Sequence, residues 1–530
     1  MKKLIKYTLM GSLCFAAVSC TDQEEMNINP NAAASVPPNM IMNAAEKWTM
    51  DNIYDEWFSG RQCLVYSQQW SQRNYTEEDR YQIRESVNNG YFKYLYMGLN
   101  NFQRIIDMNT NEDTKDASAV YGANCNQIAA AMIMKVWLAD VMTDTWGGIP
   151  YSEALKLESD DVLYAKYDDQ KELYAQLINE LTEAVNMIDE SEPAFVSGDV
   201  IFDGDASKWK KFGNSLKCRL AIHLSKVDSN WKTYIQQALA SGVMESNDDA
   251  AKFQYSATGT EYCIFYESFY VDRRNDFAIN KTLADLMKGQ PDTLNAKSHP
   301  WEGVIDPRIH IYTVDDGRWN GMAVATQTGI QARLFTQDKV ASWYAYQPPV
   351  LSKTYAVPLM TYAELKFIIG EYNGFSEEDY REGVEASIDY WYDVMGYSYD
   401  PDEVAAYIEA VCQNVNAETY AIQKYIDLFT NGTEAWTEIR RTGYPEQIVR
   451  PGEICAVYKT DSGQVPYVFT PLSEVKGDII ARVKYPTDES TLNSESWQAA
   501  VAKLQDGTNN YYSKMFWDAR KSTYDHPANK

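Results

Sequence analysis

Residues 206–227 read A-S-K-W-K-K-F-G-N-S-L-K-C-R-L-A-I-H-L-S-K-V, and this stretch decides the fold because its spacing predicts one long helix with a continuous apolar face. Asp205 or Ser207 can cap the helix by accepting a hydrogen bond from a backbone N–H in its first turn. Gly213 lies within the apolar run, where glycine costs about 1 kcal/mol relative to alanine. We therefore expect a second helix to approach closely at Gly213. The apolar residues recur at steps of three and four and share one stripe: Trp209, Phe212, Leu216, Leu220, Leu224 and Val227.

Amphipathic segments before this helix predict the partners that cover its apolar face. A strict four-residue apolar repeat from Leu173 to Ile188 predicts an antiparallel partner helix. Earlier helices are expected over 91–106 and 118–141, and over 40–70 with a break near Gly60. Residues 68–75 are then expected to form a loop. Pairs of helices are therefore the predicted repeating unit.

The second half of the chain predicts a less regular segment followed by more helix pairs. Thr361 and Glu364 form a capping box, in which the threonine oxygen accepts the Glu364 N–H and the carboxylate reaches back. Helices are expected over 377–395, 403–412 and 421–429, and short strands near 465–469 and 480–483. We therefore predict a mainly α fold, in which a scaffold of helix pairs carries an irregular, loop-rich part and a few short strands. The predicted parts are a helical scaffold over about 40–252 and 361–445, the irregular part over about 253–360, and a mixed segment over 446–530.

The charge balance of the chain excludes one class of partner. The 530 residues contain 48 basic and 75 acidic side chains, which gives a formal net charge of -27. Affinity for a nucleic acid backbone comes largely from Lys and Arg, so we expect no nucleic acid partner. No Pro/Gly/Ser linker divides the chain, and we therefore expect one large folded unit over residues 40–530.

The N-terminus predicts export. Three lysines precede a short apolar run, and small residues lead to Cys20, so residues 1–19 are expected to be a signal peptide. The pattern resembles a bacterial lipoprotein signal, which implies that Cys20 is acylated. The acidic T-D-Q-E-E that follows resembles the tag of Bacteroidetes lipoproteins exported to the cell surface. Residues 20–39 are polar and rich in Asn and Pro, and they are expected to form a lipidated tether.

Motifs for chemistry are weak. The four histidines have no H-x-x-x-H spacing, and neither G-x-S-x-G nor a phosphate-binding G-x-x-x-x-G-K-[ST] occurs, so we predict no metal, no cofactor and no catalytic residue. Asp140 and Asp144 lie one helical turn apart, and a glycosidase needs two carboxyl groups roughly 5 to 9.5 Å apart. Because acids are so numerous, we interpret Asp144 as a capping or loop-ordering residue and His223 as a core residue. Six cysteines beyond Cys20 and the signal peptide are widely spaced without a C-x-x-C pair, and their pairing stays open.

An ordered set of motifs resembles one family over essentially the whole chain that follows the signal peptide. The set begins with the lipoprotein cysteine, and it resembles the SusD/RagB family, most closely its SusD-like branch. The blocks, in order, are D-T-W-G-G-I-P-Y-S-E-A (144–154), W-K-K-F-G-N-S-L-K-C-R-L-A-I-H-L-S (209–225), D-P-R (306–308), M-T-Y-A-E-L-K-F-I (360–368), I-Q-K-Y-I (422–426) and E-A-W-T-E-I-R-R-T-G-Y-P (434–445).

The resemblance implies both a fold and a function. It implies a tetratricopeptide-like helical scaffold with an irregular ligand-facing part. It also implies a lipid-anchored protein of the outer membrane, facing the exterior, that acts as a lid over a SusC-like TonB-dependent transporter. Such proteins hold glycans, or in some cases peptides, for import. A surface hydrolase and a pure protein-interaction scaffold stay open as less favoured alternatives.

Aromatic and guanidinium groups in the predicted loops are the positive signal for ligand binding. The chain has 39 Tyr and 14 Trp, residues that combine a flat apolar face with a polar tip. Those within helical repeats are expected to pack in the core, whereas those in loops can face a ligand. The predicted ligand-binding residues are Trp70, Arg73, Tyr75, Tyr266, Phe269, Tyr270, Arg273 and Arg274.

Overall fold

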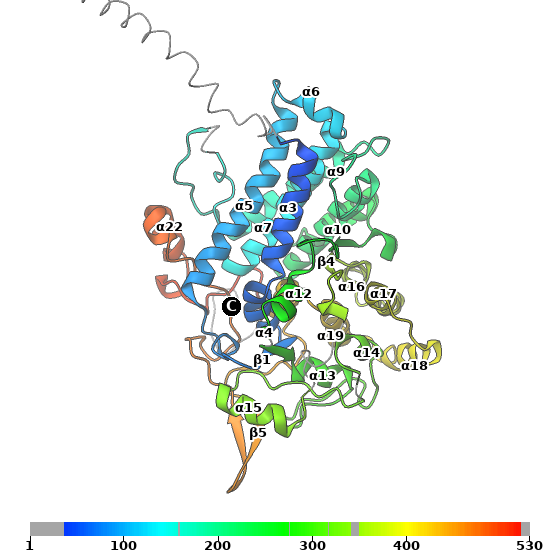
Figure 1. Ribbon diagram of the computed structural model, residues 1–530, viewed down its shortest axis with the longest axis vertical. Helices are drawn as coiled ribbons and strands as arrows, with labels where there is room; N and C mark the ends of the chain where they lie inside the picture. The colour runs from blue at the N-terminus through cyan, green and yellow to red at the C-terminus, as the bar shows by residue number, and fades with distance from the viewer. Residues whose placement is uncertain (1–35, 157–159, 275, 316, 341–348, 521–530) are drawn as a thin grey trace, which may run out of the picture.

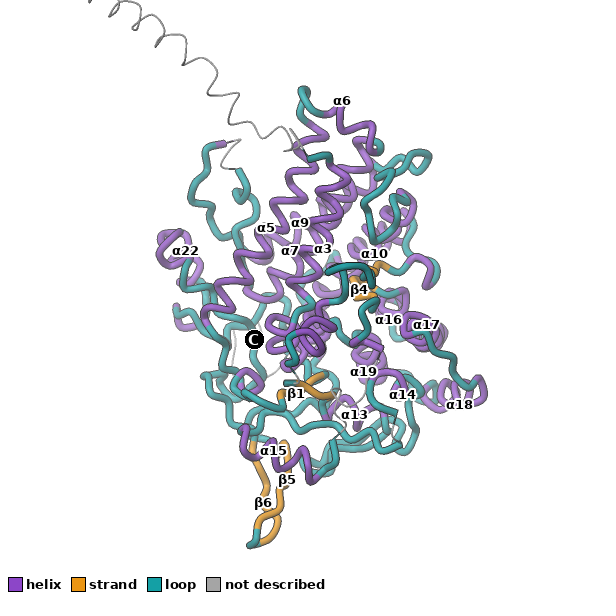
Figure 2. Tube along the Cα trace, in the orientation of Figure 1, coloured by secondary structure: helices purple, strands orange, loops and turns teal. Residues whose placement is uncertain are grey.

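The computed structural model describes residues 36–156, 160–274, 276–315, 317–340 and 349–520 (Figure 1). It is mainly helical, which confirms the predicted fold class (Figure 2). Cys20 and the predicted signal peptide lie outside the described residues. The longer helices are α3 (Pro38–Ile53), α5 (Glu85–Thr110), α7 (Asn124–Trp146), α9 (Gln170–Met187), α10 (Ala206–His223), α11 (Trp231–Ser241), α15 (Thr328–Gln337), α16 (Tyr362–Tyr372), α17 (Glu377–Met395), α18 (Pro401–Val411), α19 (Ala417–Asp427), α20 (Gly432–Thr442) and α22 (Ser494–Ala502).

Short helices and strands connect these elements. The six described strands form three separate antiparallel pairs, β1 with β3, β2 with β4, and β5 with β6. The strands are β1 (Trp70–Gln72), β2 (Ala251–Gln254), β3 (Phe277–Ile279), β4 (Ala356–Met360), β5 (Ile454–Thr460) and β6 (Gly463–Val468). The short helices are η1 (Glu56–Cys63), α4 (Leu64–Tyr66), α6 (Lys115–Ser118), α12 (Ile264–Tyr266), η6 (Glu267–Val271), α13 (Lys281–Met287), α14 (Ile309–Tyr312) and α21 (Glu489–Leu492).

Two predicted details of secondary structure are wrong. Residues 70–72 were expected in a loop but form β1, because β3 comes from a segment about 200 residues away and supplies its hydrogen bonds. Residues 480–483 were expected to form a strand, but they belong to no described strand, and the Ile480 and Ala481 carbonyls accept hydrogen bonds from the Trp436 and Arg440 side chains. The expected strand near 465–469 is confirmed as β6.

Successive helices pack as antiparallel neighbours around α10. The chain of contacts runs from α3 through α5, α7 and α9 to α10, and α10 also contacts α11 and α16 (Figure 1). Every residue from Phe212 to Leu224 is buried, so α10 is covered on all sides rather than along one stripe. Val227, at the end of the predicted stripe, is 36% exposed and lies beyond the last helical turn.

Two local predictions about α10 are confirmed. Asp205 caps the helix, since its carboxylate accepts the Lys208 N–H at 3.1 Å. A Cβ on Gly213 would lie 2.7 Å from Cγ1 of Val185 on α9, so this glycine permits the close approach of the two helices. Lys217 is off the stripe as expected, yet it is buried because its Nζ donates to Thr182 and Gln237.

A buried network of charges joins α10 to the helices around it. Arg219 donates two hydrogen bonds of 2.7 Å to the carboxylate of Glu364 on α16. His223 lies 3.1 Å from Oε1 of Glu434 on α20, and its other ring nitrogen lies 3.1 Å from the Tyr174 hydroxyl on α9. Thr361 accepts the Glu364 N–H as predicted, but the Glu364 carboxylate binds Arg219 instead of closing the capping box.

The network holds charge on His223. Burial alone would lower the pKa of His223, but Glu434 and Asp144 outweigh burial and raise the pKa to about 9. The same contacts with His223 and Arg219 lower the pKa of Glu434 to about 2 against the opposing effect of burial. The folded state therefore favours the ionised pair at neutral pH.

The packing of α10 predicts which substitutions on the apolar stripe destabilise the protein. Leu220→Ala should lower the free energy of unfolding by about 2 to 5 kcal/mol, because Leu220 is fully buried and its truncation leaves a cavity. The matched change Val227→Ala, on the same predicted stripe, should cost less than about 1 kcal/mol because Val227 is partly exposed. Chemical denaturation of both variants measures the difference, and equal losses would contradict this packing.

The charge on His223 predicts that stability falls on the alkaline side. Its pKa is higher in the folded state, so its contribution is full below about pH 6.5 and is lost as the pH rises through about 9. The free energy of unfolding should drop by about 3 kcal/mol across this window. In His223→Gln the drop should vanish, whereas His299→Gln should retain it, since burial lowers the pKa of His299. Denaturant titrations at several pH values test this, and an unchanged slope in His223→Gln would refute it.

Candidate functional site

Helices α12 and η6 form one short helical segment with aromatic residues on two faces. Tyr262, Tyr266 and Tyr270 follow a four-residue step, which places the three rings side by side along one face. Phe265 and Phe269 follow the same step on a neighbouring face, which is turned toward the core. Both phenylalanines are buried, whereas the three tyrosines are partly exposed. We call Tyr262, Tyr266 and Tyr270, together with Lys353, the tyrosine row.

The three rings of the tyrosine row lie next to one another and are partly exposed to solvent. Successive ring centroids lie 5.4 and 5.3 Å apart. The Lys353 ammonium lies 5.9 Å from the Tyr262 ring and 5.3 Å from the Tyr266 ring. The Tyr270 hydroxyl has no hydrogen-bond partner among the described residues, and burial together with Tyr266 raises its pKa. The row thus offers partly exposed apolar ring faces and a cation, whereas the Tyr270 hydroxyl is buried.

The buried face of this segment packs on Trp70. The Trp70 ring lies 5.2 Å from Phe265, 6.1 Å from Phe269 and 5.5 Å from Phe277. Trp70 itself is fully buried, because β1 pairs with β3 and turns its indole into the core. The sequence predicts that Trp70 and Phe269 face a ligand, but both side chains are buried. They support the tyrosine row from beneath.

A second group of side chains gathers around Trp57 in η1, and of this group the sequence predicts Arg274 for the ligand site. The guanidinium groups of Arg61, Arg84 and Arg274 lie 4.5, 5.2 and 5.8 Å from the Trp57 ring. Arg274 also donates to Oδ2 of Asp276 at 3.0 and 3.1 Å, so its guanidinium is held in place. We call Trp57, Arg61, Arg84 and Arg274 the guanidinium cluster. The side chains of Arg84 and Arg274 are 44% and 36% exposed and can meet a ligand.

The remaining predicted residues are dispersed around these two groups. Tyr75 is 56% exposed and interacts electrostatically with Arg274. Arg73 points elsewhere, since its guanidinium lies 4.2 Å from the ring of Phe335 on α15. Arg273 is exposed in a left-handed backbone conformation with φ of 56°, between the tyrosine row and the guanidinium cluster in sequence.

Five residues of these two groups are not among the predicted ligand-binding residues: Tyr262, Lys353, Trp57, Arg61 and Arg84. Tyr262 could have been found from its four-residue step to Tyr266 and Tyr270. Trp57 lies in a segment predicted to be α-helical. The structure forms a π-helix there, and no residue spacing in the sequence indicates it. Lys353 and Arg84 are brought in by the tertiary fold, from positions about 90 residues from Tyr262 and 27 residues from Trp57.

The carboxylate pair and the close His/acid groups do not form an open site. Asp140 and Asp144 are 3% and 2% exposed, which keeps a polysaccharide away from them. Asp144 accepts hydrogen bonds from the Tyr174 hydroxyl and Trp517 Nε1, so it orders the core instead of a cap or a loop. Two sets of acids close to His223 have metal-ligand spacing, but they are buried within the charged network already described.

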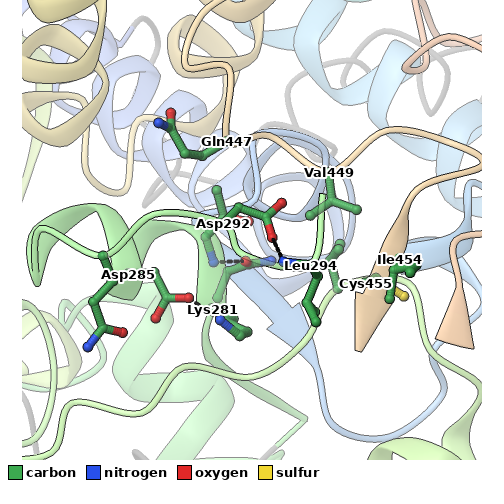
Figure 3. A pocket seen from close by; sticks show the side chains of 12 residues that line it. Lys281, Asp285, Asp292, Leu294, Gln447, Val449, Ile454 and Cys455 are labelled. Atoms are coloured by element: carbon green, nitrogen blue, oxygen red, sulfur yellow. Dashed lines mark hydrogen bonds and ion pairs between the residues drawn. The ribbon is translucent and has the colours of Figure 1, made fainter. Parts of the chain in front are cut away.

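A small pocket near β3 is too narrow for a sugar (Figure 3). Lys281 and Asp285 form an ion pair along its wall, and Asp292 accepts the Leu294 N–H at 3.0 Å. The pocket volume is about 30 Å³, which is room for about one water molecule. The six cysteines among the described residues are unpaired.

The fold and the tyrosine row define a class: a mainly helical scaffold protein with a partly exposed row of aromatic side chains. Residues 30–469 match a SusD-like family described as starch-binding and associating with the outer membrane. The chain belongs to this SusD-like family. No curated protein matches the sequence.

Solved structures share the fold across nearly the whole chain. A SusD homologue from Parabacteroides distasonis superposes with a TM-score of 0.71 and 22% identity, covering 91% of this chain and 97% of its own. A chitin-binding SusD homologue from Flavobacterium johnsoniae gives 0.67 and 21%, covering 91% and 100%. Among the described residues, no helix is long and apolar enough to cross a membrane.

Proposed function

We propose that this protein is a cell-surface nutrient-binding lipoprotein that captures oligosaccharides or polysaccharide fragments. In this proposal it acts as a lid on a SusC-like TonB-dependent transporter and hands the glycan over for import. Membership of a family described as starch-binding and outer-membrane-associated supports the proposal. Cys20 is the proposed site of lipidation.

The tyrosine row is the observation that carries the glycan assignment. A sugar ring presents C–H groups on its faces and hydroxyls around its edge. Three partly exposed tyrosine rings in file can pack against the C–H faces of successive sugar units, since an aromatic ring is a flat apolar surface. The Lys353 ammonium, which lies beside the Tyr266 ring, can donate hydrogen bonds to sugar oxygens.

A specific observation favours oligopeptides as the alternative ligand. Arg84 and Arg274 are partly exposed beside Trp57, and a guanidinium group is suited to bidentate binding of a peptide carboxylate or to donation to backbone carbonyls. Both side chains already pair with Glu78 and Asp276, which leaves fewer donors for a ligand. The glycan assignment is therefore preferred. A hydrolase is less favoured because the acid pair considered above is buried.

The proposed glycan site predicts a loss of affinity without a loss of stability. Tyr266→Ala/Tyr270→Ala should weaken binding of the best oligosaccharide in a panel that includes starch and chitin fragments by about tenfold or more. Each ring contributes on the order of 0.5 to 1.5 kcal/mol, and 1.4 kcal/mol is one decade of affinity. Calorimetric titration of wild type and variant measures the change.

Trp70→Ala is the matched control for this experiment. Because Trp70 is fully buried beneath the row, its truncation should lower the melting temperature sharply, at a cost of about 3 to 5 kcal/mol. The double tyrosine variant should melt close to wild type, since partly exposed side chains contribute little to stability. Unchanged affinity in a folded double variant would remove the tyrosine row from the ligand site.

The proposed anchor and partner are tested by purification from solubilised outer membranes. Wild type should fractionate with the membrane and co-purify with a large barrel transporter. Cys20→Ala should move to the soluble fraction, because several acyl chains are needed for durable anchoring and each buried CH₂ adds about 0.8 kcal/mol. A Cys20→Ala protein that stays in the membrane fraction after salt washing would contradict lipidation as the anchor. Wild type recovered repeatedly without a transporter would contradict the proposed partner.

A further inference from the structure

A groove lies along α5, on different elements from the tyrosine row. Its second wall comes from lining residues within 150–155 and 162–165, and its end wall from Pro486 to Asn493, which includes α21. The volume of the groove is about 610 Å³, within the range of about 300 to 1,000 Å³ typical of ligand sites. The groove shares no lining residue with the tyrosine row or the guanidinium cluster.

The rim of the groove is apolar and exposed. Met97 of α5, Leu163 of the second wall and Leu492 of α21 are 42%, 63% and 66% exposed, and all three line the groove. Large apolar side chains from three separate segments thus meet at one concave surface. A single exposed leucine is ordinary, but a contiguous apolar group with a polar surround marks an interaction site.

Carboxamide groups accompany these apolar side chains. Asn100 is exposed and Asn101 partly exposed, and both line the groove from α5. Asn493 donates to the Ala165 carbonyl at 2.7 Å, whereas its Oδ1 is buried without a hydrogen-bond partner among the described residues. A carboxamide presents one acceptor and two donors, which is the complement of a peptide backbone amide.

The charges of the groove favour a neutral or basic occupant. Glu153, Asp488 and Glu489 line it, against a single lysine, Lys93. Glu153 is paired with Lys166 at 2.7 Å, and Asp488 accepts from Asn89 at 2.9 Å. These two acids are therefore held in place, and because Lys93 and Lys166 balance only two of the three acids, an acidic occupant would meet a net negative charge.

The length of the groove sets the length of the occupant. Its α5 wall runs from Asn89 to Asn101, which at about 1.5 Å per residue is roughly 18 Å. At about 3.3 Å per residue, an extended chain of about five residues spans that distance. We propose that this groove binds an extended, aliphatic-rich and non-acidic segment, about five residues long, of a partner protein.

Other ligand classes fit the lining less well. A glycan needs open aromatic faces, but Phe92 is only 5% exposed, and the Tyr96 ring packs on it with its hydroxyl donated to the Pro150 carbonyl. An acyl chain would leave the groove carboxamides without partners, which costs free energy when they are desolvated. A peptide can pack aliphatic side chains against the apolar lining and pair its backbone amides with the carboxamides.

The test uses the purified full-length protein and phage-displayed random heptapeptides. Enriched peptides should be rich in aliphatic residues and lack Asp and Glu. The best peptide, synthesised and titrated calorimetrically, should lose at least tenfold in affinity to Leu163→Asp and to Met97→Asp. Val196→Asp, a change at a 59% exposed valine outside the groove, should bind as wild type does.

Three outcomes would overturn the proposal: no enrichment above that on the Leu163→Asp protein, undiminished affinity in both groove variants, or displacement of the peptide by starch or chitin oligosaccharides. Hydrogen exchange gives a readout that does not depend on the variants. Bound peptide should slow exchange in residues 89–101 and 489–493, and protection confined to other segments would also refute the site. Peptide binding that persists in Tyr266→Ala/Tyr270→Ala separates this result from any failure of the proposed glycan site.

Discussion

The charged contacts of α10 are the constraint on which the helical scaffold depends. Arg219 and His223 are fully or nearly fully buried, so each must have an opposite charge in contact, and those charges come from α16 and α20. Removal of one partner from a buried ion pair leaves an uncompensated charge at a cost of about 3 to 5 kcal/mol. The network therefore stabilises one relative placement of the helices, because an apolar core alone would tolerate helices that slide or rotate against one another.

The scaffold in turn fixes the surface proposed to bind the glycan. Trp70, Phe265, Phe269 and Phe277 form a buried aromatic layer that draws on β1, α12, η6 and β3. This layer is closely packed, and two of its rings lie on the paired strands β1 and β3. The helical segment therefore packs on a well-ordered aromatic surface. The tyrosine row is the outer face of the same segment. Its π-helical turn, in which the Asp272 N–H reaches the Glu267 carbonyl, is a geometry that often occurs at functional sites.

The distribution of charge separates the two candidate surfaces. The chain carries a formal net charge of -27, yet the tyrosine row has Lys353 above it and the neighbouring guanidinium cluster exposes Arg84 and Arg274. The groove along α5 is acidic and apolar instead. Two surfaces of opposite chemical character on one scaffold suit two different kinds of partner, a hydroxyl-rich ligand at the first and a protein segment at the second.

The sequence by itself determined the elements that depend on local periodicity and capping. The helix that begins at 206, a cap at Asp205 or Ser207, the close approach at Gly213 and the start of α16 at Thr361 all follow from residue spacing, because helix formation is decided within a few turns. The ordered motifs also identified the family. The sequence selected Tyr266, Tyr270 and Arg274 for the candidate site, but it treated every aromatic residue in a predicted loop as equivalent.

Only the tertiary structure decided which of those rings meet water. Trp70 turns inward because β3, about 200 residues away, pairs with its strand, while Lys353 and Trp57 reach the site from segments that no local pattern connects to it. Glu364 shows that local spacing can also mislead within one helix turn. The capping box predicts that its carboxylate binds the N-terminus of its own helix, but the carboxylate accepts hydrogen bonds from Arg219. Pairing between distant segments has no period along the chain. Which distant segments pair depends on the whole fold, because each buried charge needs an opposite charge and each buried aromatic face needs a packing partner in the same structure.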